Sequence, residues 1–496
     1  MIRKNKLLIN TISSLANQVI VAVCGLILPR AILIHYGSEV NGLLSSITQF
    51  LGLIAFMELG VGAVVQSAMY KPLATNDELE LSKIMISARN FFRKISIIFL
   101  IYIAILTVIF PLIINNRFDF LYTASLIVII AISSFAEYYF GIVNQLLLNA
   151  DQKAYIHLVL RSCTQVLNVI FCMALIYYGY SIQLVKLTTS LCFMMRPLIQ
   201  WLYVKKNYRI NYQIKLDKEP IEQKWNGLAQ HIAAVILDKT DVIVLTVFSS
   251  LKDVSIYAVY YLVVNNLRQL ISSTTIGVQA LLGNLWAKNE QEKLNQTFNK
   301  VEIISHLFIT LVFTLCGCLI IPFVKIYTRG VNDTNYIVPL FALLITLANA
   351  FYSFRNSYYM MIKAAGHYKQ TQNSAIIEVI INVTVSLLLV TKYGLIGVAI
   401  GTLAAMIYRT IYMVIYLSRH ILNRPIHIYF KNLLADFIEA GLSVFVFNML
   451  SLEASSYFQL FIIAIIMGIL FSVICLSVNY AFYRNKLFDS FKLLKK

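Results

Sequence analysis

Charge is what this chain has little of. Only 13% of its 496 residues are charged, whereas 59% are hydrophobic and the mean hydropathy is +0.74. A soluble protein of this length could not cover its surface with so few charged side chains. The composition therefore excludes a soluble enzyme or binding domain and predicts an integral membrane protein.

Other absences narrow the function further. No Gly-rich loop ending in Lys-Ser or Lys-Thr is present to cradle a nucleotide phosphate, which excludes a built-in ATPase. The pair Cys316 and Cys318 has no histidine or carboxylate neighbour at metal-ligand spacing, and all seven cysteines are interpreted as small apolar fillers. We therefore predict no enzymatic activity, no metal site and no cofactor, and leave open a coupling proton or sodium ion.

Long apolar runs are present instead. A transmembrane helix needs roughly 20 apolar residues, and fourteen stretches meet this requirement, so the predicted fold is all-α with about 14 transmembrane helices. The first run is too long for a signal peptide and lacks a small-x-small cleavage site, so we expect an uncleaved first helix. The predicted helices are 7–35, 41–69, 84–114, 120–148, 155–178, 182–204, 225–248, 254–282, 298–327, 335–363, 373–391, 395–418, 431–451 and 457–483.

Lysine and arginine gather on alternate connections between these helices. The segment 205–224 alone carries six of them, whereas the opposite loops contain only isolated ones such as Arg117 and Lys252. Basic residues concentrate on the cytoplasmic side of membrane proteins. We therefore expect both termini in the cytoplasm of a bacterial inner membrane, and we interpret the net charge of +18 as this orientation signal and not as nucleic-acid binding.

The chain also resembles itself at an offset of about 214 residues. The segment "SEVNGLL" (38–44) aligns with "KDVSIYA" (252–258), Gly179 aligns with Gly394, and Arg196 aligns with Arg409. Six helices in each repeat give both halves the same orientation, with a pseudo-two-fold axis along the membrane normal, which is typical of transporters. The predicted organisation is an N-lobe (1–204), a basic cytoplasmic linker (205–224), a C-lobe (225–418), and two C-terminal helices with a basic tail (419–496).

Charged side chains inside the predicted helices are the candidate functional residues. Such charges are costly in hydrocarbon, so they line a wet cavity or pair with each other. The predicted substrate-binding cations are Arg30, Arg196, Lys239, Arg268, Arg355 and Arg409, and the predicted coupling or charge-balancing acids are Glu58, Glu137, Asp238 and Asp241. Two further charges, Arg161 and Glu378, fall near helix ends, where they can also snorkel toward water.

Several of these residues have two readings. Arg196 and Arg409 either brace their own lobes through buried pairs or face the cavity. Lys239 either meets substrate or forms an internal clasp with Asp238 and Asp241. Arginine dominates the set, and its planar fork suits bidentate contact with phosphate oxygens, so an anionic substrate is favoured.

Three ordered segments resemble a known family. They are "LPRAILIHYGSEVNGLLSSITQFL" at the end of the first helix, "MELGVGAVVQSAMYKPLA" in the second, and "LDKTDVIVLTVFSSLKDVSIYAVYYLV" around the seventh. With the fourteen helices, this set is similar to the Wzx-type polysaccharide flippases of the multidrug/oligosaccharidyl-lipid/polysaccharide (MOP) exporter superfamily.

The resemblance implies a flippase that moves undecaprenyl-diphosphate-linked oligosaccharide from the cytoplasmic to the outer leaflet for surface polysaccharide synthesis. It implies alternating access through a cationic cavity between two lobes, with Arg30 as the helix 1 arginine and Asp241 as the helix 7 acid. The implied partners are the lipid-linked oligosaccharide, membrane lipids and a polysaccharide polymerase.

Three alternatives stay open. A lipid II flippase of the same superfamily has the same helix count and also uses cavity arginines. A cation-coupled multidrug antiporter favours an acidic cavity, which the arginine excess opposes. A membrane polysaccharide polymerase or ligase places its chemistry in a sizeable outer loop, and the predicted outer loops are short.

Overall fold

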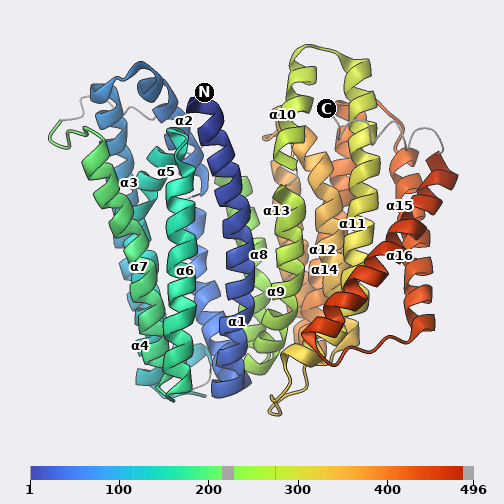
Figure 1. Ribbon diagram of the computed structural model, residues 1–496, viewed down its shortest axis with the longest axis horizontal. Helices are drawn as coiled ribbons and strands as arrows, with labels where there is room; N and C mark the ends of the chain where they lie inside the picture. The colour runs from blue at the N-terminus through green and yellow to red at the C-terminus, as the bar shows by residue number, and fades with distance from the viewer. Residues whose placement is uncertain (1, 58, 115–116, 215–227, 274, 484–496) are drawn as a thin grey trace. The chain divides into compact units, whose positions relative to one another are not determined.

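The computed structural model describes residues 2–57, 59–114, 117–214, 228–273 and 275–483, and these ranges contain helices and turns but no strand. The chain divides into two compact units, Met1–Lys239 (unit 1) and Thr240–Lys496 (unit 2). The boundary lies within α8 (Leu228–Phe248) (Figure 1). The predicted all-α class is confirmed, whereas the predicted lobe boundaries and the axis between the lobes stay predictions.

Unit 1 consists of the helices before α8 and its first half. Within it, α6 packs against α1 and α7, and α7 also packs against α4. The elements are α1 (Ile2–Gly52), the 3₁₀ turn η1 (Leu53–Met57), α2 (Leu59–Thr75), α3 (Glu78–Ile113), α4 (Phe120–Ala136), the π-helical turn η2 (Glu137–Gly141), α5 (Ile142–Ala150), α6 (Ala154–Tyr177) and α7 (Ile182–Asn207).

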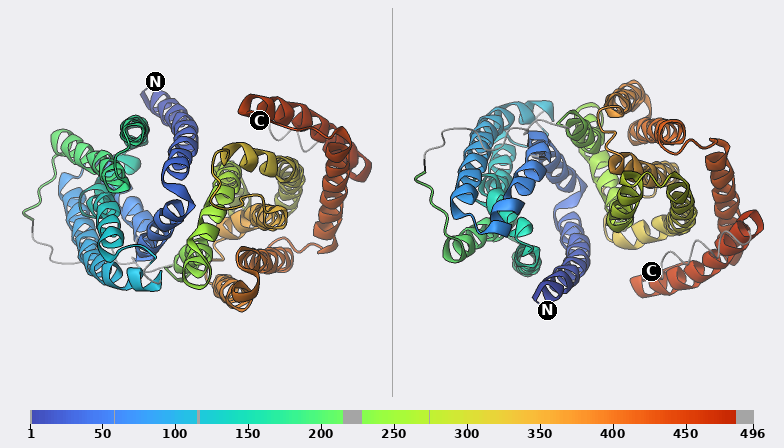
Figure 2. Two further views of the ribbon diagram at one scale, coloured as in Figure 1. Left: turned by 90° about the horizontal axis from the view of Figure 1, so that it is seen from below. Right: turned by 90° about the horizontal axis from the view of Figure 1, so that it is seen from above.

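Unit 2 continues from the second half of α8. Its closest packing joins α14 to α12 and α13, while α15 and α16 pack on α11 and on each other, as the end-on views show (Figure 2). The elements are α9 (Leu251–Ser273), α10 (Thr275–Ala287), α11 (Gln291–Tyr327), α12 (Pro339–Ala364), α13 (Gln372–Tyr393), α14 (Leu395–His420), α15 (His427–Leu450) and α16 (Tyr457–Tyr483).

Each of the fourteen predicted ranges falls mostly on helix where the structure describes it, although the range 335–363 begins four residues before α12 and three others end one residue past their helix. The first two ranges both begin in α1, which consists of two helices that meet at a kink at Gly37, where φ is 84° and ψ is 173°. The second range continues through η1 into α2. Among the described residues, ten helical segments are long and apolar enough to cross a membrane. The others, such as α2 and α12, are shorter or more polar.

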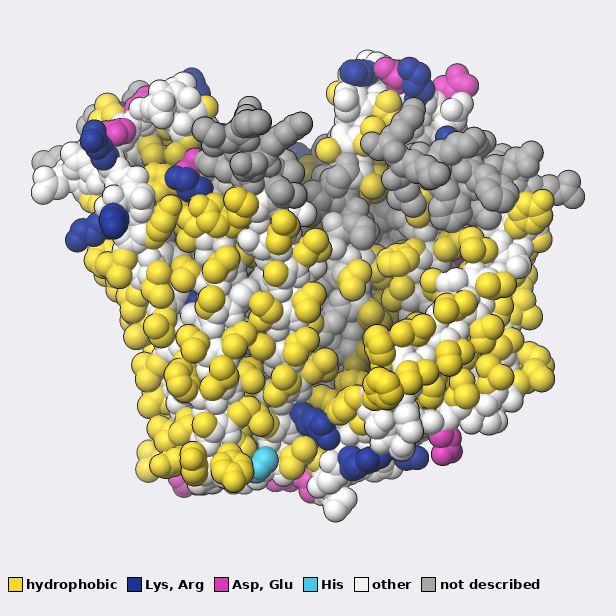
Figure 3. Space-filling view, in the orientation of Figure 1, with side chains coloured by type: hydrophobic (Ala, Val, Ile, Leu, Met, Phe, Trp, Pro, Cys, Tyr) yellow, Lys and Arg dark blue, Asp and Glu magenta, His cyan; other side chains and the backbone are white. Residues whose placement is uncertain are grey.

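Apolar side chains remain exposed along the helices. On the face shown in Figure 3, hydrophobic side chains cover the flanks of the helices and charged ones gather near the helix ends. Leu121, Leu388 and Phe458 are each more than 70% exposed. Contiguous apolar surface of this extent requires a lipid environment, so the protein is a multi-pass membrane protein.

The predicted linker begins later than the sequence suggests. Helix α7 continues through Asn207, and residues 208–214 fold back onto unit 1. The Tyr208 hydroxyl donates to Asp151 Oδ2 at 2.5 Å, and the backbone N–H of Asn211 donates to Ser82 at 3.1 Å. Burial, together with the hydrogen bond to Asp151, raises the pKa of Tyr208, so the hydroxyl keeps its proton. The rest of the linker, 215–224, lies outside the described residues.

Candidate functional site

Two arginines and one glutamate form a buried cluster in unit 2. Arg409 Nη1 on α14 donates to Glu378 Oε2 on α13 at 2.9 Å, and Arg355 Nη1 on α12 donates to Glu378 Oε1. All three side chains are buried. Because two guanidinium groups share one carboxylate, the group carries an excess of positive charge. The Nε atom of Arg409 is buried without a hydrogen-bond partner in the described part of the chain.

An aromatic ring joins a third arginine to this group. Two guanidinium groups contact the Tyr352 ring on α12. The centre of the ring lies 4.5 Å from the guanidinium carbon of Arg355 and 4.6 Å from that of Arg268 on α9. Arg268 Nη2 also donates to the Tyr261 hydroxyl at 3.0 Å. Cation–π contacts hold guanidinium groups without neutralising them. We call Arg268, Tyr352, Arg355, Glu378 and Arg409 the arginine cluster.

Close packing of α13 on α14 positions the cluster. A Cβ atom on Gly397 would lie 2.6 Å from the backbone carbonyl of Leu389, so only glycine permits this approach. Small residues four apart, here Gly397 and Gly401, are a common way to bring membrane helices together. The approach places Glu378 of α13 against Arg409 of α14.

Within unit 2, both arginines take part in buried ion pairs. Arg409 pairs with Glu378 from α14, and Arg355 pairs with it from α12. Whether they also face a cavity stays a prediction. The prediction that Glu378 can snorkel toward water is wrong, because the residue is only 4% exposed and its carboxylate pairs with the two arginines. Depth along the helix indicated a charge near a helix end, but the side chain points into the bundle, where its partners come from α12 and α14.

Asp241 on α8 is the centre of a second polar group in unit 2. Its buried carboxylate accepts hydrogen bonds from Thr402 Oγ1 at 2.7 Å, from the Tyr257 hydroxyl at 3.0 Å and from Asn382 Nδ2 at 3.3 Å. The carbonyl oxygen of the Asn382 amide is buried without a partner in the described residues. These three donors come from α9, α13 and α14, so the carboxylate joins α8 to all three helices.

The remaining predicted residues are placed as follows. Lys239 Nζ lies 3.2 Å from Asp238 Oδ2, so the internal clasp forms with Asp238. Arg30 is half-buried on α1 directly after Pro29. Glu58 lies outside the described residues.

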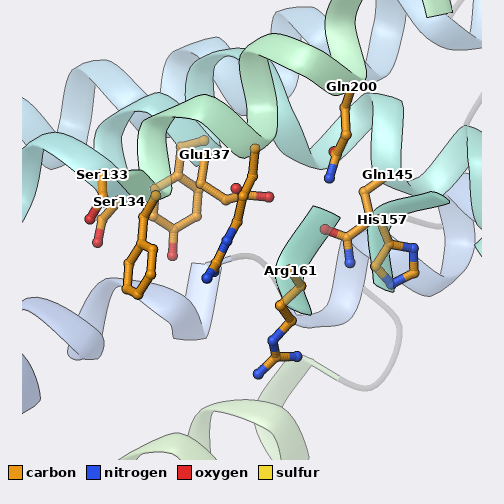
Figure 4. Close-up of a pocket in the computed structure, with 10 residues that line it drawn as sticks. Ser133, Ser134, Glu137, Gln145, His157, Arg161 and Gln200 are labelled. Carbon is orange, nitrogen blue, oxygen red and sulfur yellow. The ribbon is translucent and has the colours of Figure 1, made fainter. Parts of the chain in front are cut away.

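Unit 1 brings the last two predicted residues, Glu137 and Arg196, into a pocket of about 310 Å³ (Figure 4). In Figure 4, Ser133, Ser134 and Glu137 lie toward one end of the pocket and Gln145, His157 and Gln200 toward the other. The lining residues come from α4, η2, α5, α6 and α7: Ser133, Ser134, Glu137, Tyr138, Gln145, His157, Arg161, Phe193, Arg196 and Gln200.

Arg196 is held in place by its neighbours. Its Nε donates to Thr164 Oγ1 at 2.5 Å and its Nη2 to Gln165 Oε1 at 3.3 Å, both on α6. Its guanidinium carbon lies 4.0 Å from the centre of the Phe193 ring. Arg196 therefore has fixed partners, but among them is no carboxylate like the one that neutralises Arg409.

The π-helical turn sets the position of Glu137. A Cβ atom on Gly141 would lie 2.7 Å from Glu137 Oε1, so the carboxylate folds back over its own helix. Turns of π-helix inside α-helices are often found at functional sites. No hydrogen bond or ion pair joins the Glu137 carboxylate to any residue that the structure describes.

A further buried polar network in unit 2 was not among the predicted site residues. His306 Nδ1 lies 2.6 Å from Asp436 Oδ2, which links α11 to α15, and Arg424 donates to both oxygens of Glu302 at 2.6 and 2.7 Å. The signal was available, since Glu302, His306 and Asp436 all lie inside predicted spans. This network attaches α15 to the rest of unit 2.

Comparison with known proteins relates the fold to membrane transporters. No protein-family model matches the chain, and no curated protein matches it. A solved structure of the lipid II flippase MurJ, in an inward closed conformation, matches with a TM-score of 0.71 and 16% identity, covering 96% of this chain and 99% of that one.

Multidrug transporters have similar structures. An inward-facing MATE family transporter of the MOP superfamily matches with a TM-score of 0.61 and 14% identity, covering 79% of this chain and 94% of its own. The eukaryotic MATE transporter AtDTX14 matches with a TM-score of 0.59 and 11% identity, covering 84% and 95%. At these identities the likeness concerns the fold alone: the chain shares its fold with this flippase and with these two transporters.

Proposed function

We propose that this protein is a Wzx-type flippase that moves undecaprenyl-diphosphate-linked oligosaccharide from the cytoplasmic to the outer leaflet of a bacterial inner membrane. Both termini lie in the cytoplasm, and the exported units go to a polysaccharide polymerase. The arginine cluster carries this proposal. Buried guanidinium groups that exceed the neighbouring carboxylates attract an anion, and paired N–H groups suit phosphate oxygens.

The same cluster argues against a multidrug antiporter. Within the arginine cluster, as defined above by its described residues, three guanidinium groups face one carboxylate, that of Glu378, so a cationic drug would meet more positive than negative charge there. Coverage also favours a flippase, because the MurJ match extends over 96% of the chain and the two MATE matches over 79% and 84%. The lipid II flippase remains the rival, since lipid II also carries its head group on a diphosphate.

The membrane potential provides a driving force. Moving negative charge outward across an inside-negative membrane is favourable by about 2.3 kcal/mol per charge per 100 mV. A diphosphate with roughly two charges therefore gains on the order of 4–5 kcal/mol, which biases transport without ATP.

We propose Asp241 as the coupling acid, because a carboxylate, a hydroxyl and an amide meet there within one unit. Rotating the Asn382 amide would turn its unpartnered oxygen toward the carboxylate, giving an oxygen-lined site of the kind that alkali cations prefer. Transport that is stimulated by a sodium gradient in the native protein and not in Asp241→Asn supports this assignment. Stimulation by a proton gradient alone identifies the proton as the coupling ion, and gradient-independent transport rejects coupling.

Complementation distinguishes the two flippase functions. The gene is expressed in one strain that lacks its polysaccharide flippase and in another that is depleted of its lipid II flippase. We expect surface polysaccharide to return in the first strain and no growth rescue in the second. Rescue of the second strain alone would establish lipid II as the substrate and overturn the proposal. Arg268→Ala and Arg355→Ala should abolish rescue while the protein still inserts. The matched control, Arg329→Ala at an exposed turn, should rescue as the native protein does.

A further inference from the structure

The pocket of unit 1 contains polar side chains without partners in the described part of the chain. The side chains of six lining residues make no hydrogen bond or ion pair with any described residue: Ser134, Glu137, Gln145, His157, Arg161 and Gln200. Gln200 is only 3% exposed, and its Oε1 atom is buried, as is Nδ1 of His157. Buried polar groups are normally paired, because each unpaired one costs free energy.

The kinds of groups in the pocket restrict what can satisfy them. Glu137 accepts hydrogen bonds only, Arg161 donates only, and the amides of Gln145 and Gln200 do both. A metal cation is disfavoured by Arg161 and Arg196. A bridging diphosphate has no hydroxyl group and only accepts, so it would leave the carboxylate of Glu137 and the buried Oε1 of Gln200 unsatisfied, and the carboxylate would repel it.

A ligand with many hydroxyl groups can form hydrogen bonds with all of these donors and acceptors in the pocket. Each hydroxyl donates one hydrogen bond and accepts others, so neighbouring hydroxyls on a ring can serve Glu137 and Arg161 together. The Phe193 ring supplies an apolar surface for the C–H face of such a ring. The volume of about 310 Å³ is roughly ten times the ~30 Å³ share of one water molecule, and it lies at the small end of ligand pockets.

We infer that the pocket between α4, α6 and α7 in unit 1 binds a sugar residue. This inference rests on the proposed function and deepens it, because the sugar belongs to the lipid-linked oligosaccharide. The arginine cluster then serves the diphosphate, and this pocket serves the glycan. Glu137 and Gln200 accept from sugar hydroxyls, Arg161 donates to them, and Gly141 keeps the carboxylate of Glu137 in place.

Saturation-transfer NMR on the full chain in lipid nanodiscs tests the assignment. The probes are glucose, galactose, N-acetylglucosamine and glucuronic acid, with inorganic pyrophosphate as the competing chemistry. We expect at least one sugar to bind, and Glu137→Gln and Gln200→Leu each to weaken it by about fivefold or more, as expected for loss of a buried hydrogen bond. The matched exposed controls, Glu453→Gln and Gln296→Leu, should bind as the native chain does.

Three results would overturn the sugar pocket. The first is that none of the four sugars binds. The second is that sugar binds equally well to Glu137→Gln, to Gln200→Leu and to the native chain. The third is that pyrophosphate binds and sugar does not, and that Gln200→Leu abolishes the binding of pyrophosphate. Elution profile and melting temperature confirm that each variant is folded. Sugar binding in the pocket without translocation of lipid-linked oligosaccharide would reject the proposed function alone, whereas translocation with normal binding in both variants would reject the pocket alone.

Discussion

Arg196 in unit 1 and Arg409 in unit 2 stand 213 residues apart, yet their surroundings differ. Arg409 donates to Glu378 on the neighbouring helix, whereas Arg196 donates to Thr164, which lies 214 residues before Glu378. In unit 1 the acid is Glu137, on a different helix and without a hydrogen bond. The position of one carboxylate thus distinguishes the two units. In unit 2 it forms a buried ion pair with Arg409, whereas in unit 1 it lines a polar pocket.

Removing the acid should therefore affect the two units very differently. Glu378→Ala leaves Arg355 and Arg409 buried without their carboxylate, and breaking a buried pair in this way costs about 3–5 kcal/mol. Glu137→Ala removes a carboxylate without hydrogen bonds and should cost less than about 1 kcal/mol. Unfolding followed by circular dichroism in detergent measures both, and equal losses would contradict the comparison.

Rebuilding the unit 2 arrangement in unit 1 sharpens the comparison. Thr164→Glu places a carboxylate beside Arg196, and we expect the two to couple by about 1–3 kcal/mol in a double-mutant cycle with Arg196→Met. The cycle cancels the strain of the larger side chain at a buried position. A coupling near zero would mean that α6 and α7 do not bring these positions together as α13 and α14 do.

A smaller change tests the geometry of the pocket alone. Gly141→Ala adds a methyl group where the Glu137 carboxylate lies, and the carboxylate must move. We expect sugar binding to weaken severalfold while the free energy of unfolding changes by about 1 kcal/mol or less, because the displaced atoms are the end of a flexible side chain. Gly62→Ala, where a Cβ meets only ordinary contacts, is the matched control. Unchanged binding in Gly141→Ala would show that the position of Glu137 is not critical.

The smallest effect is expected at the clasp on α8. Lys239 and Asp238 are both partly exposed, at 23% and 34% for their side chains. Partly exposed pairs contribute about 0–1 kcal/mol, so Lys239→Met should leave the melting temperature nearly unchanged. A loss as large as that of Glu378→Ala would show that Lys239 belongs to a buried network.

The helices were predictable from sequence because hydropathy depends on local composition. Each of the fourteen ranges falls mostly on helix in the described part of the chain, including α1 with its internal kink. Side-chain partners were not predictable in the same way. Asp241 meets residues 141 and 161 positions away, and such contacts depend on how helices pack and not on spacing along one helix.

Charge was an uneven guide to the site. It led to Arg196, Arg355 and Arg409, because charges in a span are rare, and the structure places them in the pocket of unit 1 and in the arginine cluster. It missed Gln145 and Gln200, which are uncharged and look like ordinary polar residues in sequence, although the pocket depends on them. It also misjudged Glu378, since distance from a helix end does not say which way a side chain points.

The most direct test of the proposed function is translocation in proteoliposomes of defined orientation. Fluorescent undecaprenyl-diphosphate-linked oligosaccharide is added on the cytoplasmic side, a potassium gradient sets either a potential that is negative on that side or no potential, and the flipped fraction is measured by quenching. The account predicts translocation by the native protein that is faster with the potential imposed, and loss of translocation in Arg268→Ala with the fold intact. Equal translocation by Arg268→Ala and the native protein, or no translocation by either, would contradict it.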